Sequence, residues 1–110
     1  MALWTKAGIK TLKDAVELAR SPDTPPDRHD QMVKMIVGSM TPSHWEVFEQ
    51  LHFTGPVWDG SIISKSHRND LIEVGLATRV CYKGAQGYTA TTYPAYTVWL
   101  ESGRKRKLAA

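Results

Sequence analysis

The arrangement of glycines and β-prone residues between positions 55 and 92 restricts the fold more than any other feature of this chain. A short polar and basic stretch ends at Gly75, and two runs rich in β-branched and aromatic residues follow it, joined by Gly84-Ala85-Gln86-Gly87. Glycine commonly ends a helix in the left-handed conformation, and β-branched and aromatic side chains favour strands. The order therefore predicts a helix followed by a β-hairpin. The predicted bounds are a helix from Ser64 or Ser66 to Val74, with Leu71, Ile72 and Leu76 facing inward, strands over 77–83 and 88–92, and a turn over 84–87.

Three further helices are predicted upstream from apolar residues that recur at spacings of three and four. Their expected spans are 5–20, 24–40 with Thr24, Pro25 and Pro26 at its start, and 41–54 with Thr41-Pro42 at its start. Ser43 and Glu46 offer an alternative capping box for the third helix. The segment 96–100 fits a further strand by propensity and equally a closing helix that begins near Thr92, and we favour the helix.

Length and composition indicate one globular domain. The chain has 110 residues, of which 42% are hydrophobic and 23% charged, and this composition is too apolar for intrinsic disorder. We expect a single domain over 1–103, in which 1–23 forms an N-terminal helix and a proline connector. Residues 104–110 form a basic tail whose last residues, Lys107-Leu108-Ala109-Ala110, look like a cloning remnant. No apolar run approaches the roughly 18 residues of a membrane span.

The net charge of +3 is carried by the tail. Residues 1–60 have a net charge of −2 and residues 61–103 have +1, whereas Arg104 to Lys107 add four positive charges. The net charge is therefore weak evidence for a nucleic-acid partner. Cys81 is the single cysteine, so an intrachain disulfide is impossible, and a cytoplasmic location is expected. A lone cysteine on a core-facing strand is expected to be a small buried apolar residue.

The sequence SKSHRNDLIEVGLATRV resembles the recognition-helix segment of winged helix-turn-helix regulators. The resemblance covers roughly residues 41–92 and is carried by Leu71, Gly75, Leu76, Arg79 and the hairpin turn. It implies an α+β winged helix-turn-helix fold, with N-terminal helices followed by a recognition helix and a C-terminal β-hairpin wing. Where those regulators place a full second helix, this chain has only WDGSIIS, so the helix-turn-helix is expected to be truncated. Small phage or prophage-encoded winged-helix proteins are the most similar kind.

The function that this resemblance implies is non-enzymatic binding of double-stranded DNA, as a transcription regulator. The N-terminal end of a helix suits phosphate contacts, and arginine and asparagine can make bidentate contacts with bases. The candidate DNA-binding residues are Lys65, Ser66, His67, Arg68 and Asn69 at the helix start, Arg79 in the first strand, and Lys83 and Gln86 at the expected hairpin tip. The alternative is that the residues at the helix start form the solvated face of a surface helix.

A second reading is a winged-helix module that binds a host enzyme or complex through protein–protein contacts. Trp45, Phe48 and Trp99 are expected in the core, but the remaining aromatic residues are many for a domain of this size. Some of these, Trp4, Trp58, Tyr88, Tyr93 and Tyr96, are expected either in an exposed patch or over the base of the hairpin. A continuous positive face joining Lys65, Arg68, Arg79 and Lys83 would favour DNA, and a mixed face beside exposed aromatics would favour a protein partner. A homodimer through Leu12 and Val16 of the first helix is also expected.

The chain shows no catalytic or metal-binding pattern. Histidines 29, 44, 52 and 67 lack the spacing of a zinc site, and the glycines at 84–87 lead into a strand rather than the helix that a phosphate-binding loop requires. The paired acids Asp27/Asp30 and Glu46/Glu49 fit solvated helix faces. We expect no catalytic residues, no metal and no cofactor.

Overall fold

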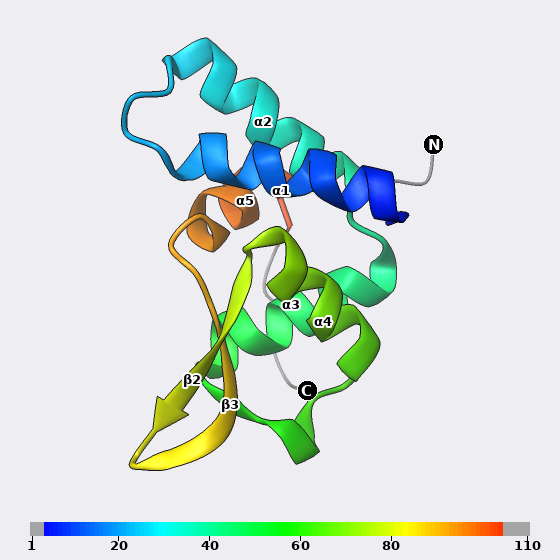
Figure 1. Ribbon diagram of the computed structural model, residues 1–110, viewed down its shortest axis with the longest axis vertical. Coiled ribbons are helices and arrows are strands. Elements are labelled where there is room, and N and C mark those ends of the chain that lie inside the picture. The colour runs from blue at the N-terminus through cyan, green and yellow to red at the C-terminus, as the bar shows by residue number, and fades with distance from the viewer. Residues whose placement is uncertain (1–3, 105–110) are drawn as a thin grey trace.

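The computed structural model describes residues 4–104, which form a compact α+β fold (Figure 1). A small three-stranded antiparallel sheet accompanies five α-helices and one short 3-10 helix within these residues. The elements, in chain order, are α1 (Lys6–Arg20), α2 (Pro26–Ser39), α3 (Pro42–Thr54), β1 (Val57–Trp58), the 3-10 helix η1 (Asp59–Ser61), α4 (Lys65–Val74), β2 (Ala77–Tyr82), β3 (Ala85–Thr91) and α5 (Ala95–Ser102). In Figure 1, α1 and α2 cross the top of the molecule and the β2–β3 hairpin projects from the bottom.

The first two helices form close to where the sequence predicts them. Thr5 caps α1, since its hydroxyl oxygen accepts a hydrogen bond from the Gly8 amide at 3.2 Å. The predicted start of α2 is wrong by one residue, because Pro25 rather than Thr24 occupies the capping position. The Thr24 hydroxyl instead donates to the Leu18 carbonyl at 2.6 Å, which ties the proline connector back to α1.

Helix α3 confirms the start predicted at Thr41 and Pro42. The Thr41 hydroxyl oxygen accepts a hydrogen bond from the His44 amide at 3.2 Å, so the alternative start at Ser43 does not occur. Trp45 and Phe48 are buried, as predicted, and Trp99 from α5 lies against them with ring centroids 6.4 Å away in each case.

Helix α4 has the predicted register. Leu71 is fully buried, and Gly75 adopts the left-handed conformation with φ of 95°. The Leu76 amide donates to the Leu71 carbonyl at 2.9 Å, and the Gly75 amide donates to the Ile72 carbonyl at 3.1 Å, which is the hydrogen-bond pattern of a glycine-terminated helix. Leu76 is also buried, whereas Ile72 is only half-buried. The segment before α4 contains only β1 and η1, so the full second helix of a helix-turn-helix is absent from it.

The hairpin turn begins one residue earlier than predicted and has two residues instead of four. Tyr82 pairs with Ala85, so Lys83 and Gly84 form the turn, both with positive φ, as a two-residue hairpin turn of type I′ requires. Gly87, predicted in the turn, lies within β3. The register shifts by one residue beyond Val80, which leaves two residues of β3 opposite Cys81 and makes a bulge. Strand β1 was not predicted from the sequence. It pairs with β3 and gives the strand order β1-β3-β2.

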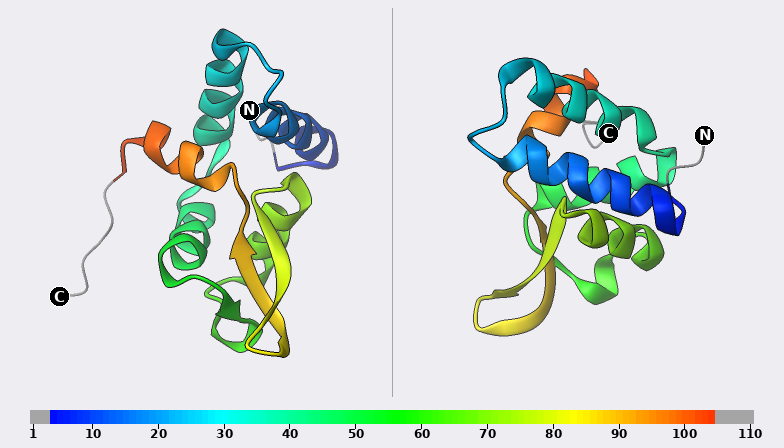
Figure 2. Two further views of the ribbon diagram at one scale, coloured as in Figure 1. Left: turned by 90° about the vertical axis from the view of Figure 1, so that its left-hand side faces the viewer. Right: turned by 45° about the horizontal axis from the view of Figure 1, so that its top comes forward.

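The last predicted element is a helix. Residues 95–102 form α5, with Pro94 at its N-terminal cap, and α5 packs against α2 (Figure 2). Ala95, Val98 and Trp99 are buried. Helix α5 therefore closes the same core that the N-terminal helices begin.

The two α1 residues predicted to form a dimer contact are buried within the chain itself. Leu12 is 1% exposed and Val16 is 3% exposed, because α1 packs against α2 and α4 of the same chain. The apolar stripe of α1 thus belongs to the chain's own core. Among the described residues, no helix is long and apolar enough to cross a membrane. Lys105 to Ala110 of the predicted basic tail lie outside the described residues, and Arg104 stacks over the Trp45 ring at 5.0 Å.

Candidate binding surface

The residues predicted at the start of α4 divide into two groups. Lys65, Ser66 and Asn69 are exposed, as contact with a ligand would require. Arg68 is buried, with 6% of its surface exposed, and His67 is half-buried. Arg68 is therefore not placed for base contact as the chain is folded here, and its predicted role stays a prediction.

Asp59 in η1 explains the position of Arg68. The Arg68 Nη1 atom donates to Asp59 Oδ1 at 2.9 Å, and Arg79 Nη2 donates to Asp59 Oδ2 at 2.7 Å. Arg68 Nε also donates to the Asn69 side-chain oxygen at 2.9 Å, which occupies the acceptor that Asn69 would offer to adenine. One carboxylate thus joins two predicted DNA-binding arginines. Asp59 was not singled out from the sequence, because its partners lie 9 and 20 positions further along the chain.

His67 faces a buried histidine that sequence reasoning did not single out. His44 is 2% exposed, with its Nε2 atom 2.8 Å from Asp70 Oδ2 and its Nδ1 atom 2.5 Å from the Thr41 hydroxyl. The Trp4 ring stacks on His44 at 3.9 Å, and the His67 ring meets it edge-on at 4.7 Å. This cluster joins the segment before α1 to α3 and α4.

The protonation of His44 is governed mainly by its burial. Desolvation lowers the pKa of His44 from its ordinary value of 6.5, and the nearby His67 ring also lowers it. The hydrogen bond and charge of Asp70 act in the opposite direction without reversing the shift. His44 therefore favours the neutral form, in which Nε2–H donates to Asp70 and Nδ1 accepts from the Thr41 hydroxyl.

The two residues predicted at the hairpin tip have different positions. Lys83 lies in the turn and is exposed, as predicted. Gln86 lies in β3 instead, because the turn is formed by Lys83 and Gly84. Cys81 was predicted to be buried but is exposed. Alternation places it on the same sheet face as the buried Thr89, but Cys81 is nearer the tip, beyond the reach of the core.

The other face of the sheet is apolar although it faces solvent. Register places Thr78, Ala85 and Ala90 on it together with four larger side chains, which are here called the outer sheet face: Trp58, Val80, Tyr82 and Tyr88. Trp58 is 50% exposed and Tyr82 is 38% exposed. Tyr88 contacts both rings edge-on, with centroids 5.6 Å from Trp58 and 5.3 Å from Tyr82. The outward face of an antiparallel sheet is more commonly polar, so this face is a candidate interface.

The indole ring of Trp58 also lies close to the backbone at two glycines. A β-carbon at Gly60 would stand 2.8 Å from Trp58 Nε1, and one at Gly87 would stand 2.7 Å from Cζ3. Both distances are too short for any side chain, so the two glycines allow the ring to lie close against the chain. Trp58 is therefore held in place while half of its surface remains available for contact.

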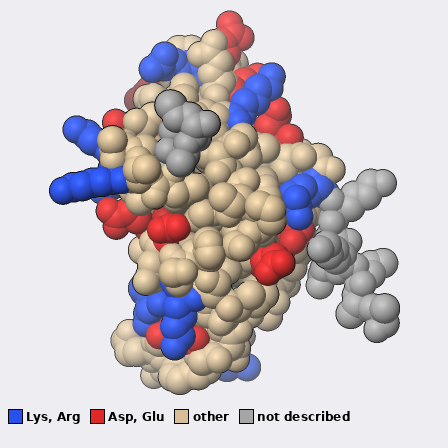
Figure 3. Space-filling view, turned by 90° about the vertical axis from the view of Figure 1, so that its right-hand side faces the viewer, with Lys and Arg blue, Asp and Glu red and all other residues tan. Residues whose placement is uncertain are grey.

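Charge around this surface is mixed. Lys83 lies over the Tyr82 ring at 5.4 Å, while Asp59 partly offsets the charges of Arg68 and Arg79. On another face of the molecule, the right-hand side of Figure 1 shown in Figure 3, positive and negative side chains also lie near one another. The continuous positive face that would favour DNA is thus interrupted at Asp59.

No metal-binding arrangement emerges within residues 4–104. No group of three or more His, Cys, Asp or Glu side chains in this part of the chain is placed to hold a metal ion. Comparison with protein-family models, curated proteins and solved structures gives no match to this chain. The functional inference therefore depends on the geometry above.

Proposed function

We propose that the chain is a non-enzymatic binding module that uses a winged-helix scaffold to hold a protein partner on its outer sheet face. The order α3, β1, η1, α4, β2, β3 and the strand order β1-β3-β2 support this scaffold. In this reading α4 is the recognition helix, the β2–β3 hairpin is the wing, and η1 stands in the place of the second helix. The partner is expected to be an enzyme or complex of the host cell.

The observation that carries the proposal is the half-exposed Trp58, seated on Gly60 and Gly87. Tryptophan and tyrosine are enriched among the residues that dominate the affinity of protein interfaces. A ring already held in its bound position loses little conformational freedom on association, which favours affinity. Trp58 would fill an apolar pocket of the partner, with Tyr82 and Tyr88 packing beside it.

The mixed charge favours a protein partner over duplex DNA. Asp59 lies between Arg68 and Arg79, where its carboxylate would repel an approaching phosphate. Asn69 is engaged by Arg68, so reading of bases by α4 would first require this network to open. A protein interface has no such requirement, since its core is depleted in charged groups.

The test compares Trp58→Ala with Tyr96→Ala, which removes an aromatic ring of similar exposure from α5. Immobilised wild-type chain is used to capture proteins from host-cell extract, and the captured partner is then purified and its affinity measured with each variant. We expect Tyr96→Ala to bind like the wild type and Trp58→Ala to bind at least about 30-fold more weakly, the loss expected for an interface hot spot of about 2 kcal/mol. Equal affinity of the two variants for every purified partner would reject the proposal.

A second candidate function is that of a duplex DNA-binding transcription regulator. It is favoured by exposed cations on α4 and the hairpin, namely Lys65, Arg79 and Lys83. The Ser64 side chain makes no capping hydrogen bond, so backbone amides at the start of α4 could contact phosphate. The test uses protein truncated after Gly103, which removes the basic tail. Its duplex affinity should fall with salt at a log–log slope of about −0.9 per phosphate neutralised.

Lys65→Gln should reduce that slope by roughly one phosphate contact, whereas Lys34→Gln, an exposed change on α2, should leave it unchanged. If the truncated protein binds no duplex at low salt, the DNA candidate is rejected. That result would leave the protein-partner proposal standing.

A further inference from the structure

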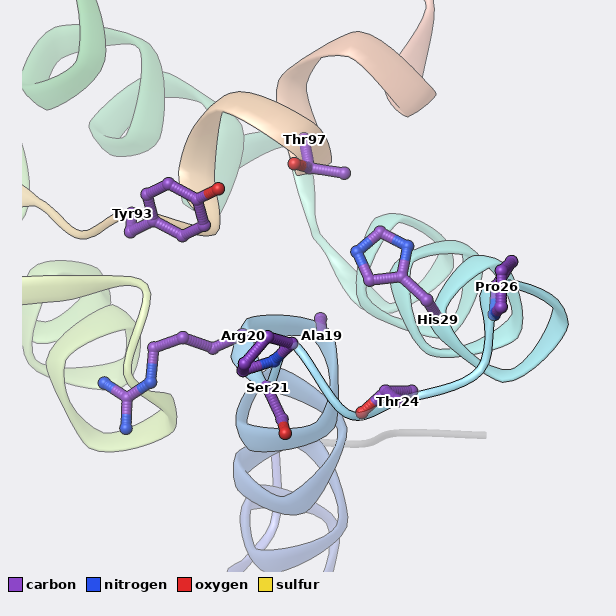
Figure 4. A pocket seen from close by; sticks show the side chains of 9 residues that line it. Ala19, Arg20, Ser21, Thr24, Pro26, His29, Tyr93 and Thr97 are labelled. Atoms are coloured by element: carbon purple, nitrogen blue, oxygen red, sulfur yellow. The ribbon is translucent and has the colours of Figure 1, made fainter.

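A pocket of about 380 Å³ lies where α1 ends, α2 begins and α5 starts. The polar side chains that line it are Arg20, Ser21, Thr24, His29, Tyr93 and Thr97. Figure 4 shows the rings of Tyr93 and His29 on opposite sides of the pocket, with Thr97 between them. None of these residues belongs to the outer sheet face, so the pocket is a separate candidate site.

The lining is rich in hydrogen-bond donors. It offers a guanidinium, an imidazole and four hydroxyl groups, and none of the described residues that line it is Asp or Glu. The acids nearby lie outside the lining: Glu17 contacts Arg20 at 2.9 Å, and Asp30 lies 3.7 Å from His29. A concave site of this size, with several donors and no lining carboxylate, is suited to a small ligand that carries negative charge.

Several of these donors are available. The Tyr93 and Thr97 hydroxyls have no hydrogen-bond partner among the described residues, and Tyr93 is 82% exposed. The Arg20 pair with Glu17 is exposed on both sides, so it contributes little stability, and a guanidinium keeps further N–H groups for a second acceptor. A ligand therefore does not have to break a strong internal contact.

The start of α2 adds a favourable field at the same place. Pro26, the first residue of α2, lines the pocket, and no side chain caps this helix. Pro25 and Pro26 have no amide N–H, so the amides of Asp27 and Arg28 supply the partial positive charge of this helix N-terminus. The Asp27 carboxylate in the same turn offsets part of that charge. The carbonyl groups at the end of α1 carry partial negative charge, which would disfavour an anion. Two of these carbonyls are engaged, because the Thr24 hydroxyl donates to the Leu18 carbonyl and the Ser21 amide donates to the Glu17 carbonyl.

We propose that this pocket binds a small organic anion. Its phosphate or carboxylate contacts the Thr97 hydroxyl and Arg20, and its uncharged body lies between the Tyr93 and His29 rings. The Arg20 guanidinium points away from Thr97 in Figure 4, so it leaves its exposed pair with Glu17 and turns toward Thr97 when the anion binds. The two ring walls distinguish this ligand from a bare inorganic ion, which would leave the space between them unfilled. Binding here does not depend on the protein-partner function, because no residue is shared between the two sites.

The experiment is a titration of the full chain, followed by the amide signals of residues 19–29 and 93–97 in two-dimensional NMR. The probes are phenyl phosphate, benzoate, inorganic phosphate and, as the uncharged control, benzyl alcohol. We expect saturable shifts confined to these residues, with a Kd of about 1 mM or tighter, for at least one of the two aromatic anions. A response to phenyl phosphate alone would assign the ligand as a phosphate, and a response to benzoate alone as a carboxylate.

Variants then test the contacts. Arg20→Gln and Thr97→Val should each weaken binding roughly tenfold, as expected for loss of a hydrogen bond to a charged group. The matched control is Arg28→Gln, which removes an exposed charge from α2 outside the pocket lining, and it should bind like the wild type. The proposal is overturned if neither aromatic anion causes saturable shifts at about 10 mM. It is also overturned if benzyl alcohol or inorganic phosphate binds as tightly as both aromatic anions. The third contrary result is an Arg28→Gln protein whose binding is weakened as much as that of Arg20→Gln.

Discussion

Trp58 and Gly87 are in direct contact across the β1–β3 pair, so close that a β-carbon at Gly87 would stand 2.7 Å from the indole ring. Gly87 also has a φ of 91°, a conformation that other residues rarely adopt. The Gly87 position is thus restricted twice, once by its backbone and once by the ring above it. Both restrictions can be measured separately, because Gly84 has the first without the second.

Gly87→Ala is expected to lower the free energy of unfolding by roughly 2–4 kcal/mol, from backbone strain and a clash with Trp58. Gly84→Ala, with a φ of 79° and no atom within 4 Å of its added β-carbon, should lower it by only about 1 kcal/mol. The measurement is urea unfolding followed by circular dichroism. In a Trp58→Ala background the two penalties should become similar. Equal penalties in the wild-type background would show that the ring moves aside freely.

Asp59→Asn should destabilise the chain by roughly 1–3 kcal/mol, because it leaves the buried Arg68 guanidinium without its counter-charge. The figure is set below that of a fully buried pair because the Asp59 side chain is 28% exposed. Glu17→Gln is the matched control, since it breaks an exposed pair with Arg20 and should cost less than about 1 kcal/mol. Chemical denaturation of both variants checks this, and an Asp59→Asn protein as stable as Glu17→Gln would contradict the assigned role.

Leu71→Ala should cost about 2–5 kcal/mol, the range for emptying a core leucine site, because Leu71 is fully buried on the inward side of α4. Ile63→Ala is a useful comparison, as Ile63 is 59% exposed just before α4 and should change the free energy of unfolding by less than about 0.5 kcal/mol. Thermal unfolding of the two proteins beside the wild type is sufficient. A mild Leu71→Ala effect would indicate that the core collapses to fill the cavity.

Stability should decrease on acidification, and His44 should contribute to the decrease. Burial lowers the pKa of His44 in the folded chain, whereas the unfolded chain keeps the ordinary value of 6.5. The unfolded state therefore binds more protons below pH 6.5, so the contribution of His44 is complete above that pH. It is lost as the pH falls toward the lower folded-state pKa. Burial also lowers the pKa of His52, which adds a contribution of the same sign.

Urea unfolding measured from about pH 8 to about pH 5 tests this dependence, with His44→Gln as the variant. Glutamine has no titratable group but keeps an N–H donor for Asp70, so the slope of unfolding free energy against pH should become shallower. His29→Gln, a change at a half-buried position on α2, is the control. An unchanged slope in His44→Gln would mean that the other groups carry the whole pH dependence.

Local signals in the sequence were sufficient for most of the helices. Gly75 ends α4, and Thr41 followed by Pro42 begins α3, because caps and proline act through the residues next to them. The hairpin was predicted with its turn misplaced, since both Gly84 and Gly87 have positive φ and the sequence does not show which of them forms the turn. Gly87 lies in β3 against the Trp58 ring, a contact between residues that are distant in sequence.

The candidate surface was less predictable because its decisive contacts are distant in sequence. The pairing of Asp59 with both Arg68 and Arg79 could not be read from the sequence, although Arg79 remains exposed. Exposure of Cys81 depends on how far the core extends along the hairpin, which alternation alone does not reveal. The aromatic excess was visible in the sequence, but the placement of Trp58, Tyr82 and Tyr88 on one sheet face depends on the register.

The two ends of the β2–β3 hairpin are fastened to each other where the hairpin leaves the body. Thr92 donates from its amide to the Leu76 carbonyl at 3.0 Å and from its hydroxyl to the Gly75 carbonyl at 2.5 Å. The hairpin therefore leaves the helical body and returns to it at the same place. Its length can change without moving the segments on either side of it. Residues inserted between Lys83 and Gly84 would extend the hairpin at little cost to the helices, as exposed loop tips commonly allow. The reach of this arm can thus diverge between related chains, or be changed by engineering, while the helical body stays the same.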